Sequence, residues 1–224
     1  MPLRGKQRLA LVGVVVAAVM LALVFAGSRA STGAKSSTGR QTSPSRAAGS
    51  PTAIPADIAR LKSIGLLPGD LPEGTHLINA TELSNNAAAS YDPEKVKQVD
   101  ATGRITGVVQ QWRQDTAQFD FLNEIDLFNS AASATTRLMA KPQLDPSIHL
   151  QDEPDPKLGD ASRMYGYSNP SPEGKLLQIY VVAWVRGRLL LLITAGGPLG
   201  GLQRDQPLQA AHALDNRVAA LPTP

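Results

Sequence analysis

Residues 176–195, LLQIYVVAWVRGRLLLLITA, limit the folds open to this chain more than any other segment. Two apolar runs rich in β-branched and aromatic residues flank Arg186-Gly187, and glycine readily takes the positive φ of a tight turn. The segment is therefore predicted to form a β-hairpin that turns at these two residues. Alternation puts apolar side chains on both faces of both strands, which indicates a hairpin at the centre of a sheet that is covered on each side.

The same segment is long enough for a membrane helix, but its charges argue against one. Arg186 and Arg188 would lie well inside the hydrocarbon layer, where each arginine costs about 2.5–3.5 kcal/mol at a helix centre. The strand-forming composition and the glycine between the two runs also favour a hairpin in a folded core.

A second apolar segment, residues 9–26, has a different character. Its eighteen residues contain no charge and no proline, and they follow the basic side chains of Arg4, Lys6 and Arg8. A cleaved signal peptide and an uncleaved anchor both fit this pattern, and the length favours the anchor because a spanning helix needs about 20 residues. We expect residues 1–8 in the cytoplasm and residues 9–26 as a single-pass signal-anchor helix in the cytoplasmic membrane, with the rest of the chain outside.

Residues 27–53 consist mainly of Ser, Thr, Gly, Ala and Arg, so they are predicted to form a flexible linker with little apolar surface to bury. Residues 1–53 carry seven basic and no acidic side chains, whereas the rest of the chain holds fifteen basic and nineteen acidic ones. The part that folds is thus mildly acidic, and we expect no nucleic acid as a partner.

Residues 54–224 are predicted to form one extracytoplasmic domain. Helical patterns lie within residues 55–66, 85–100, 130–140 and 206–221, with a start signal at Asp92 in the second and Ser130 as the N-cap candidate of the third. Strand patterns cover residues 75–83, 103–115, 118–129, 148–150 and 161–168, in addition to the hairpin. Loops are expected at the acidic, proline-containing residues 151–160 and at the glycine-rich residues 196–201. The fold class is α+β: an antiparallel sheet with the central hairpin 176–195, packed by helices.

Residues 156–161 (PKLGDA), followed by an aromatic strand and the hairpin turn 185–188 (VRGR), resemble actinobacterial lipoproteins and kinase sensor domains. The layout is also similar to the Mog1/PsbP-like α+β group. The resemblance covers the C-terminal half, implies an extracytoplasmic α+β domain, and assigns no residue a function. Those families usually carry cysteines. This chain has none, which excludes disulfides and thiolate chemistry.

Sequence motifs for metals and cofactors are missing, and none of either is predicted. His76, His149 and His212 lack the spacing of a metal site. The acidic residues of 151–160 do not follow the pattern of a calcium loop, and residues 196–201 lack the Lys-Ser/Thr of a phosphate loop.

Catalytic residues are not predicted either. Glu124 and Asp126 alternate with apolar residues, and we expect both acids on the solvent face of a strand. No nucleophile motif of the Gly-x-Ser-x-Gly type occurs.

Aromatic and basic side chains provide the best candidate for a ligand groove, in which rings line the walls and an arginine holds an anionic group. The candidate ligand-binding residues are Trp112, Arg113, Arg163, Tyr165, Tyr180 and Trp184. Large aromatics more often fill a core, and that alternative stays open.

The expected topology and the missing catalytic motifs favour a bacterial, membrane-anchored domain that binds or senses an envelope ligand or protein without catalysis. One alternative is an envelope hydrolase with a dispersed acid/base site, which would need paired carboxylates converging in a cleft. Another is a purely structural tethering domain, which would need only a flat contact patch.

Overall fold

The computed structural model describes residues 55–140, 148, 150–170 and 174–221. The predicted cytoplasmic segment 1–8, anchor 9–26 and linker 27–53 lie outside these residues. In the part of the chain that is described, no helix has both the length and the apolar character needed to cross a membrane.

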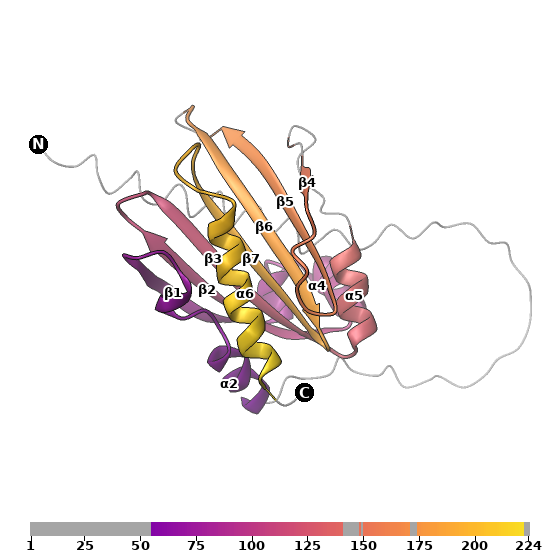
Figure 1. Ribbon diagram of the computed structural model, residues 1–224. Coiled ribbons are helices and arrows are strands. Elements are labelled where there is room, and N and C mark those ends of the chain that lie inside the picture. Colours follow the sequence, from indigo (N-terminus) through magenta and orange to yellow (C-terminus); the bar gives the residue numbers. More distant parts are fainter. Residues whose placement is uncertain (1–54, 141–147, 149, 171–173, 222–224) are drawn as a thin grey trace, which may run out of the picture.

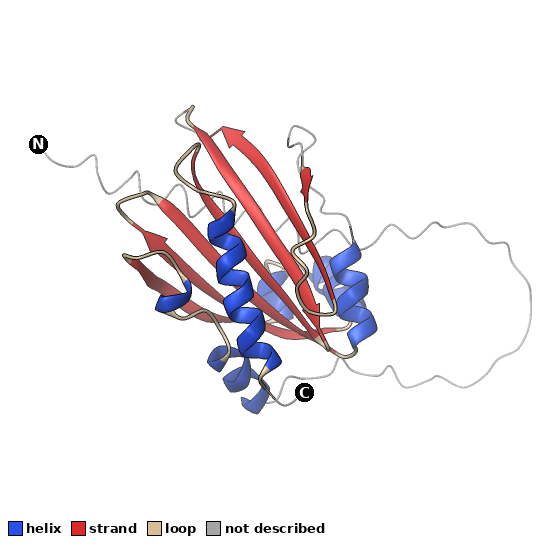
Figure 2. Ribbon diagram, viewed as in Figure 1, coloured by secondary structure: helices blue, strands red, loops and turns tan. Residues whose placement is uncertain are grey.

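Seven strands form one antiparallel sheet in the order β1-β2-β3-β7-β6-β5-β4, as Figures 1 and 2 show. Their bounds are β1 Thr75–Leu83, β2 Arg104–Gln114, β3 Phe119–Phe128, β4 Gln151–Glu153, β5 Ala161–Pro170, β6 Leu176–Arg186 and β7 Leu189–Pro198. With the helices that pack on this sheet, the fold is the predicted α+β class. The long hairpin β6–β7 occupies its centre and is buried on both faces, as predicted.

The central hairpin turns one residue later than predicted. Arg186 pairs with Leu189, so the two turn residues are Gly187 and Arg188, and Gly187 has a φ of 57°. A glycine meets this requirement without steric cost. The later turn moves each cross-strand partner by two residues, which leaves every side chain on its predicted face; Trp184, for example, lies opposite Leu191.

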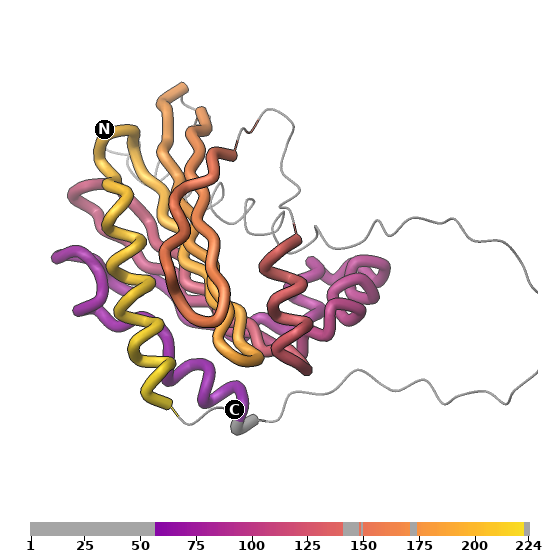
Figure 3. Tube along the Cα trace, turned by 45° about the vertical axis from the view of Figure 1, so that its right-hand side comes forward, coloured from indigo at the N-terminus to yellow at the C-terminus, as the bar shows by residue number. Residues whose placement is uncertain are grey.

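Helices pack on both faces of the sheet, and Figure 3 shows the two groups on opposite sides. One group comprises α2 Pro55–Ser63, the 3-10 helix η1 Pro68–Asp70 and α6 Asp205–Ala219. The other comprises α3 Asn85–Ala88, α4 Pro93–Ala101 and α5 Ala131–Met139. We call the two sides of the sheet the α6 face, which carries Trp184 and Leu191, and the α5 face, which carries Val185 and Leu190.

Local signals explain where the helices begin. The Asp92 carboxylate accepts hydrogen bonds from the amides of Glu94 and Lys95 at the start of α4, and the Ser130 hydroxyl accepts one from the Ser133 amide in α5. Residues 85–100 contain two helices, and the second begins at the predicted start signal, Asp92. Ser90 and Tyr91 between the helices have positive φ values of 52° and 59°.

Two predicted loops contain strand. β4 occupies the first three residues of the predicted loop 151–160 and pairs with β5 at the edge of the sheet. Ile148 and Leu150, predicted to be part of a strand, are not in one, and His149 lies outside the described residues. β7 continues through Gly196 and Gly197 to Pro198.

The opposite edge of the sheet is β1, a strand of nine residues whose side chains are mostly exposed. Its pairing with β2 shifts between Leu77 and Asn79, so Ile78 is an extra residue, a β-bulge. Leu77 and Ile78 are each 45% exposed.

Candidate functional site

The six predicted ligand-binding residues are divided between the two faces of the sheet. Trp112, Tyr180 and Trp184 lie on the α6 face, within or against its core cluster. Alternation along β2 and β5 puts the other three, Arg113, Arg163 and Tyr165, on the α5 face. Because the sheet separates the two sets, the six side chains do not line one groove.

On the α6 face the two tryptophans fill the core. Trp112 and Trp184 are 3% and 0% exposed, and the Trp184 indole donates a hydrogen bond of 3.0 Å to Asp215 in α6. Tyr180 is half-buried against the same cluster. The alternative that large aromatics build the core is therefore confirmed for the two tryptophans.

On the α5 face the two arginines lie far apart. Arg113 in β2 donates to Asp120 at 2.8 Å, whereas Arg163 in β5 lies over the Tyr165 ring at 4.9 Å and within 3.8 Å of Asp152. Four strand spacings separate β2 from β5, a distance of about 19 Å. A small ligand held by one of these arginines would not reach the other, and a ligand role for either residue stays a prediction.

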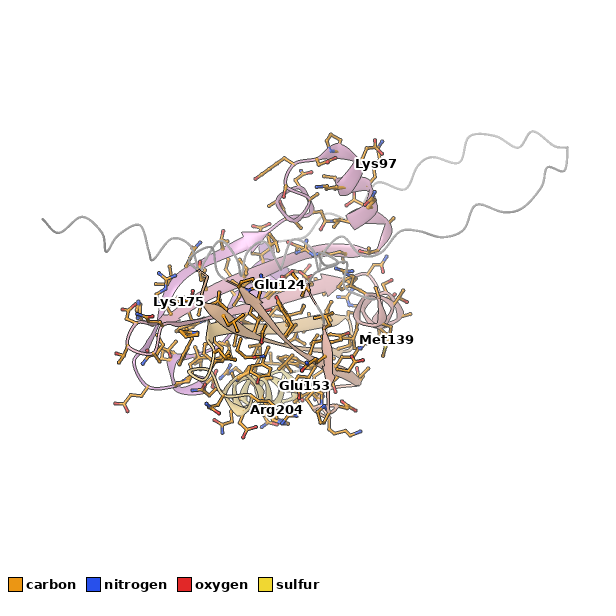
Figure 4. All side chains as sticks on the ribbon, turned by 90° about the horizontal axis from the view of Figure 1, so that it is seen from above. Lys97, Glu124, Met139, Glu153, Lys175 and Arg204 are labelled. Carbon is orange, nitrogen blue, oxygen red and sulfur yellow. The ribbon has the colours of Figure 1, made fainter. Side chains whose placement is uncertain are left out.

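Glu124 and Asp126 are buried, so the prediction that they lie on the solvent face is wrong. They are only 3% and 4% exposed on the α5 face, where their β3 positions pair with Leu192 and Leu190 of β7. The alternating pattern of β3 is real, but its charged face is covered as well. Figure 4 shows Glu124 on the sheet, away from the side where Glu153 and Arg204 meet.

Arg104 of β2 is the ion-pair partner of Asp126, at 2.6 Å, and is itself 4% exposed. Its guanidinium also donates to the Asn85 side chain at 2.7 Å and to the Leu83 carbonyl at 2.9 Å. Gly107 makes room for the pair, since a Cβ at that position would collide with both charged groups. The buried acid is thus matched by a buried base from the neighbouring strand, which makes its burial tolerable.

Glu124 has no basic residue within ion-pairing distance in the described part of the chain. Burial, followed by the charge of Asp126, raises the pKa of Glu124 well above its ordinary value, against the opposing effect of Arg104 and Arg137. Glu124 therefore keeps its proton to a higher pH than an exposed glutamate. Burial in turn lowers the pKa of Arg137, and the two acids oppose that shift.

Arg137 lines a cavity of about 310 Å3 between α5 and the C-terminal end of α4. The lining residues are Ala101, Thr102, Ala132, Ser133, Thr136, Arg137 and Ala140. Figure 3 shows the two helices at the same end of the sheet. Between α4 and β2, the Gly103 carbonyl accepts a hydrogen bond of 2.8 Å from the Asn129 amide, which lies between β3 and α5. Among the described residues, the Arg137 guanidinium has no hydrogen-bond acceptor or ion-pair partner within reach.

A second polar cluster on the α6 face is centred on Asp215. Its carboxylate accepts from Arg186 at 2.9 and 2.7 Å, from the Trp184 indole at 3.0 Å and from the Gly159 amide at 3.3 Å. Burial alone would raise the pKa of Asp215, but these donors, with Arg186 first among them, hold it below its ordinary value. We call this set the Asp215 lock.

The Asp215 lock joins the two stretches on which the family resemblance rests. Residues 156–161 supply the Gly159 amide, and the hairpin turn 185–188 supplies the Arg186 guanidinium. Asp160 adds a hydrogen bond from the Gly187 amide at 2.7 Å. Gly159 has a φ of 53°, and a Cβ there would collide with the Val185 carbonyl. These residues therefore hold the hairpin, the loop before β5 and α6 together.

Sequence reasoning missed both Asp215 and Arg137, although each carries a signal. Asp215 interrupts the buried stripe of α6, which an acid can occupy only if donors surround it. Arg137 lies three residues after Ala134 and one before Leu138, the two buried residues of α5, and so on the flank of that helix's apolar face.

No family model matches the chain, and no curated protein matches it. Among solved structures, the fold is similar to that of the extracellular domain of PknH from Mycobacterium tuberculosis, with a TM-score of 0.51. The identity is 9%, over 77% of this chain and 100% of that chain. At that identity the likeness concerns the fold, and at that level it agrees with the predicted resemblance to kinase sensor domains.

Proposed function

We propose that the protein binds or senses a small molecule outside the cytoplasmic membrane, without catalysing a reaction. In this proposal residues 9–26 anchor the chain and residues 27–53 link the anchor to the folded domain. The similarity to the extracellular domain of PknH supports the location. The observation that carries the proposal is the cavity between α4 and α5, into which Arg137 brings donors that no described residue satisfies.

An envelope hydrolase is the second candidate, because Glu124 and Asp126 are paired carboxyl groups of which one has a raised pKa. Both are almost fully buried, and Asp126 is already paired with Arg104. A general acid or base must reach its substrate. The geometry therefore favours a supporting role for this pair beneath the cavity, and binding over hydrolysis.

Filling the cavity tests the binding proposal. Ala131 and Ala132 are both exposed on α5, but only Ala132 lines the cavity. Ala132→Trp therefore puts an indole at the cavity, whereas Ala131→Trp puts the same side chain beside it. Native mass spectrometry of the full chain in a neutral detergent should show a bound mass that denaturation releases. We expect Ala132→Trp to lose it and Ala131→Trp to keep it. Equal retention by both variants would contradict the proposed site.

The location has its own test. A protease added to intact spheroplasts should degrade the folded domain and leave a small fragment that contains residues 9–26 in the membrane fraction. Full protection of the domain until the cells are lysed would contradict an extracytoplasmic location.

A further inference from the structure

Two arginines and two acids meet on the α5 face, and their pairing is unequal. Arg104 has Asp126 at 2.6 Å together with two further acceptors. Arg137 interacts with Asp126 and Glu124 only at longer range, since neither carboxyl group lies within ion-pairing distance of it. While Glu124 keeps its proton, the cluster holds two guanidinium groups and one carboxylate. One positive charge then has no counter-ion among the described residues.

Hydrogen bonding within the cavity shows which donors are available to a ligand. The Ser133 hydroxyl donates to the Asn129 side chain at 2.9 Å, and the Thr102 hydroxyl donates to the Val99 carbonyl at 2.6 Å. The Thr136 hydroxyl, next to Arg137 on the helix, has no hydrogen-bond acceptor among the described residues. Arg137 and Thr136 both line the cavity and therefore each provide free donors to it.

The rest of the cavity limits the ligand's size and polarity. The other residues that line it are three alanines, Ala101, Ala132 and Ala140. Its volume of about 310 Å3 is at the lower end of the range of small-molecule pockets. An anionic head group with a short apolar body fits this wall, whereas a large or strongly polar ligand does not.

We propose that the cavity between α4 and α5 binds a small oxyanion, the carboxylate or phosphate group of a compact ligand, through the Arg137 guanidinium and the Thr136 hydroxyl. This rests on the proposed binding function and names its ligand class. A planar guanidinium pairs with either group through two parallel hydrogen bonds, which gives the arrangement both affinity and orientation. The bound anion supplies the counter-ion that Arg137 lacks.

Glu124 makes this binding sensitive to pH. The charged groups that face it are Asp126 on its own strand, Arg104 on β2 and Arg137 on α5, and the β7 residue beside it is the apolar Leu192. Loss of the Glu124 proton adds a negative charge near Arg137 and competes with the ligand's charge. The affinity for the anion therefore falls as the pH rises through the raised pKa of Glu124, and Glu124→Gln removes that fall.

The test titrates the full chain in a neutral detergent with acetate and with inorganic phosphate by calorimetry, at constant ionic strength maintained with chloride. Arg137→Gln should weaken binding by at least about tenfold, and Thr136→Val, which keeps the shape and the charge, by a smaller factor. Lys97→Gln is the matched control, since it removes an exposed positive charge from α4 outside the cavity. Tighter binding of acetate would point to a carboxylic acid as the ligand, and tighter binding of phosphate to a phosphate ester.

Three results would overturn the inference: no saturable binding of either anion, equal weakening by Arg137→Gln and Lys97→Gln, or unchanged binding in Thr136→Val together with unchanged pH dependence in Glu124→Gln. Its failure is distinguishable from that of the proposed function. A neutral bound molecule that Ala132→Trp displaces would refute the anion and leave the binding function intact.

Discussion

The two polar clusters beneath the helices, one on each face of the sheet, are built from the same residue types and differ in how fully they are satisfied. In the Asp215 lock one carboxylate accepts four hydrogen bonds, and its guanidinium partner is bidentate. On the α5 face the Asp126 carboxylate pairs with Arg104, and Arg137 has no ion-pair partner among the described residues. A closed network of the first kind adds rigidity, whereas an open one of the second kind leaves donors for a ligand.

The largest effect on this difference is expected when the shared acceptor of the Asp215 lock is removed. Asp215→Ala leaves the Trp184 indole and Arg186 without their acceptor, and we expect the free energy of unfolding to fall by about 3 kcal/mol. Denaturant unfolding followed by tryptophan fluorescence measures it. Asp205→Ala, at an exposed position in the first turn of the same helix, should change the stability little. Similar losses in the two variants would mean that the lock does not act as a unit.

Gly159→Ala disturbs the Asp215 lock through the backbone. The new Cβ would meet the Val185 carbonyl at a residue with a φ of 53°, and we expect a loss of about 2 kcal/mol in the same unfolding experiment. Gly200→Ala is the matched control, because Gly200 also has a positive φ, 85°, but nothing surrounds its Cβ position. The difference between the two variants isolates the collision from the strain of the positive φ. Equal losses in the two variants would show that the loop around Gly159 moves to accommodate the Cβ at little cost.

Glu124→Gln tests the α5 face, and here we expect a gain in the free energy of unfolding and not a loss. Because the folded-state pKa of Glu124 is raised, its contribution to stability is present below the ordinary pKa and is lost as the pH rises through the raised value. At alkaline pH the variant should therefore be more stable than the native chain, by about 1 kcal/mol. Melting temperatures at pH 5 and pH 8.5 measure this, and parallel pH profiles of the two proteins would contradict it.

Trp184→Phe should weaken the Asp215 lock less than Asp215→Ala and Gly159→Ala do. It keeps the ring in the core and removes one of the four donors to Asp215, so we expect a loss of about 1 kcal/mol in denaturant unfolding. A loss as large as that of Asp215→Ala would show that the indole, and not the carboxylate, is the centre of the lock.

The periodic parts of the sequence predicted the fold well. The hairpin, its central place and its two apolar faces follow from alternation over residues 176–195, and the starts of α4 and α5 follow from Asp92 and Ser130. The turn was misplaced by one residue because both Arg186-Gly187 and Gly187-Arg188 contain the glycine.

The site was beyond such reasoning because it depends on pairs that are distant in the sequence. Alternation shows that β3 has two faces, and it cannot show that the face with Glu124 and Asp126 is covered. Arg104, which precedes Asp126 by more than twenty residues, matches the buried charge. The six aromatic and basic candidates were chosen by residue type, and type does not reveal on which side of a sheet a residue lies.

The bulge at Ile78 affects how copies of the domain can meet at high concentration. β1 is an edge strand whose neighbour on one side is β2, and an open edge of regular strand can recruit the edge of another copy. The extra residue interrupts the row of amides and carbonyls beside two exposed apolar side chains, Leu77 and Ile78. Copies of the domain at a high local concentration would thus not join their sheets edge to edge through β1, and each domain would stay a separate folded unit.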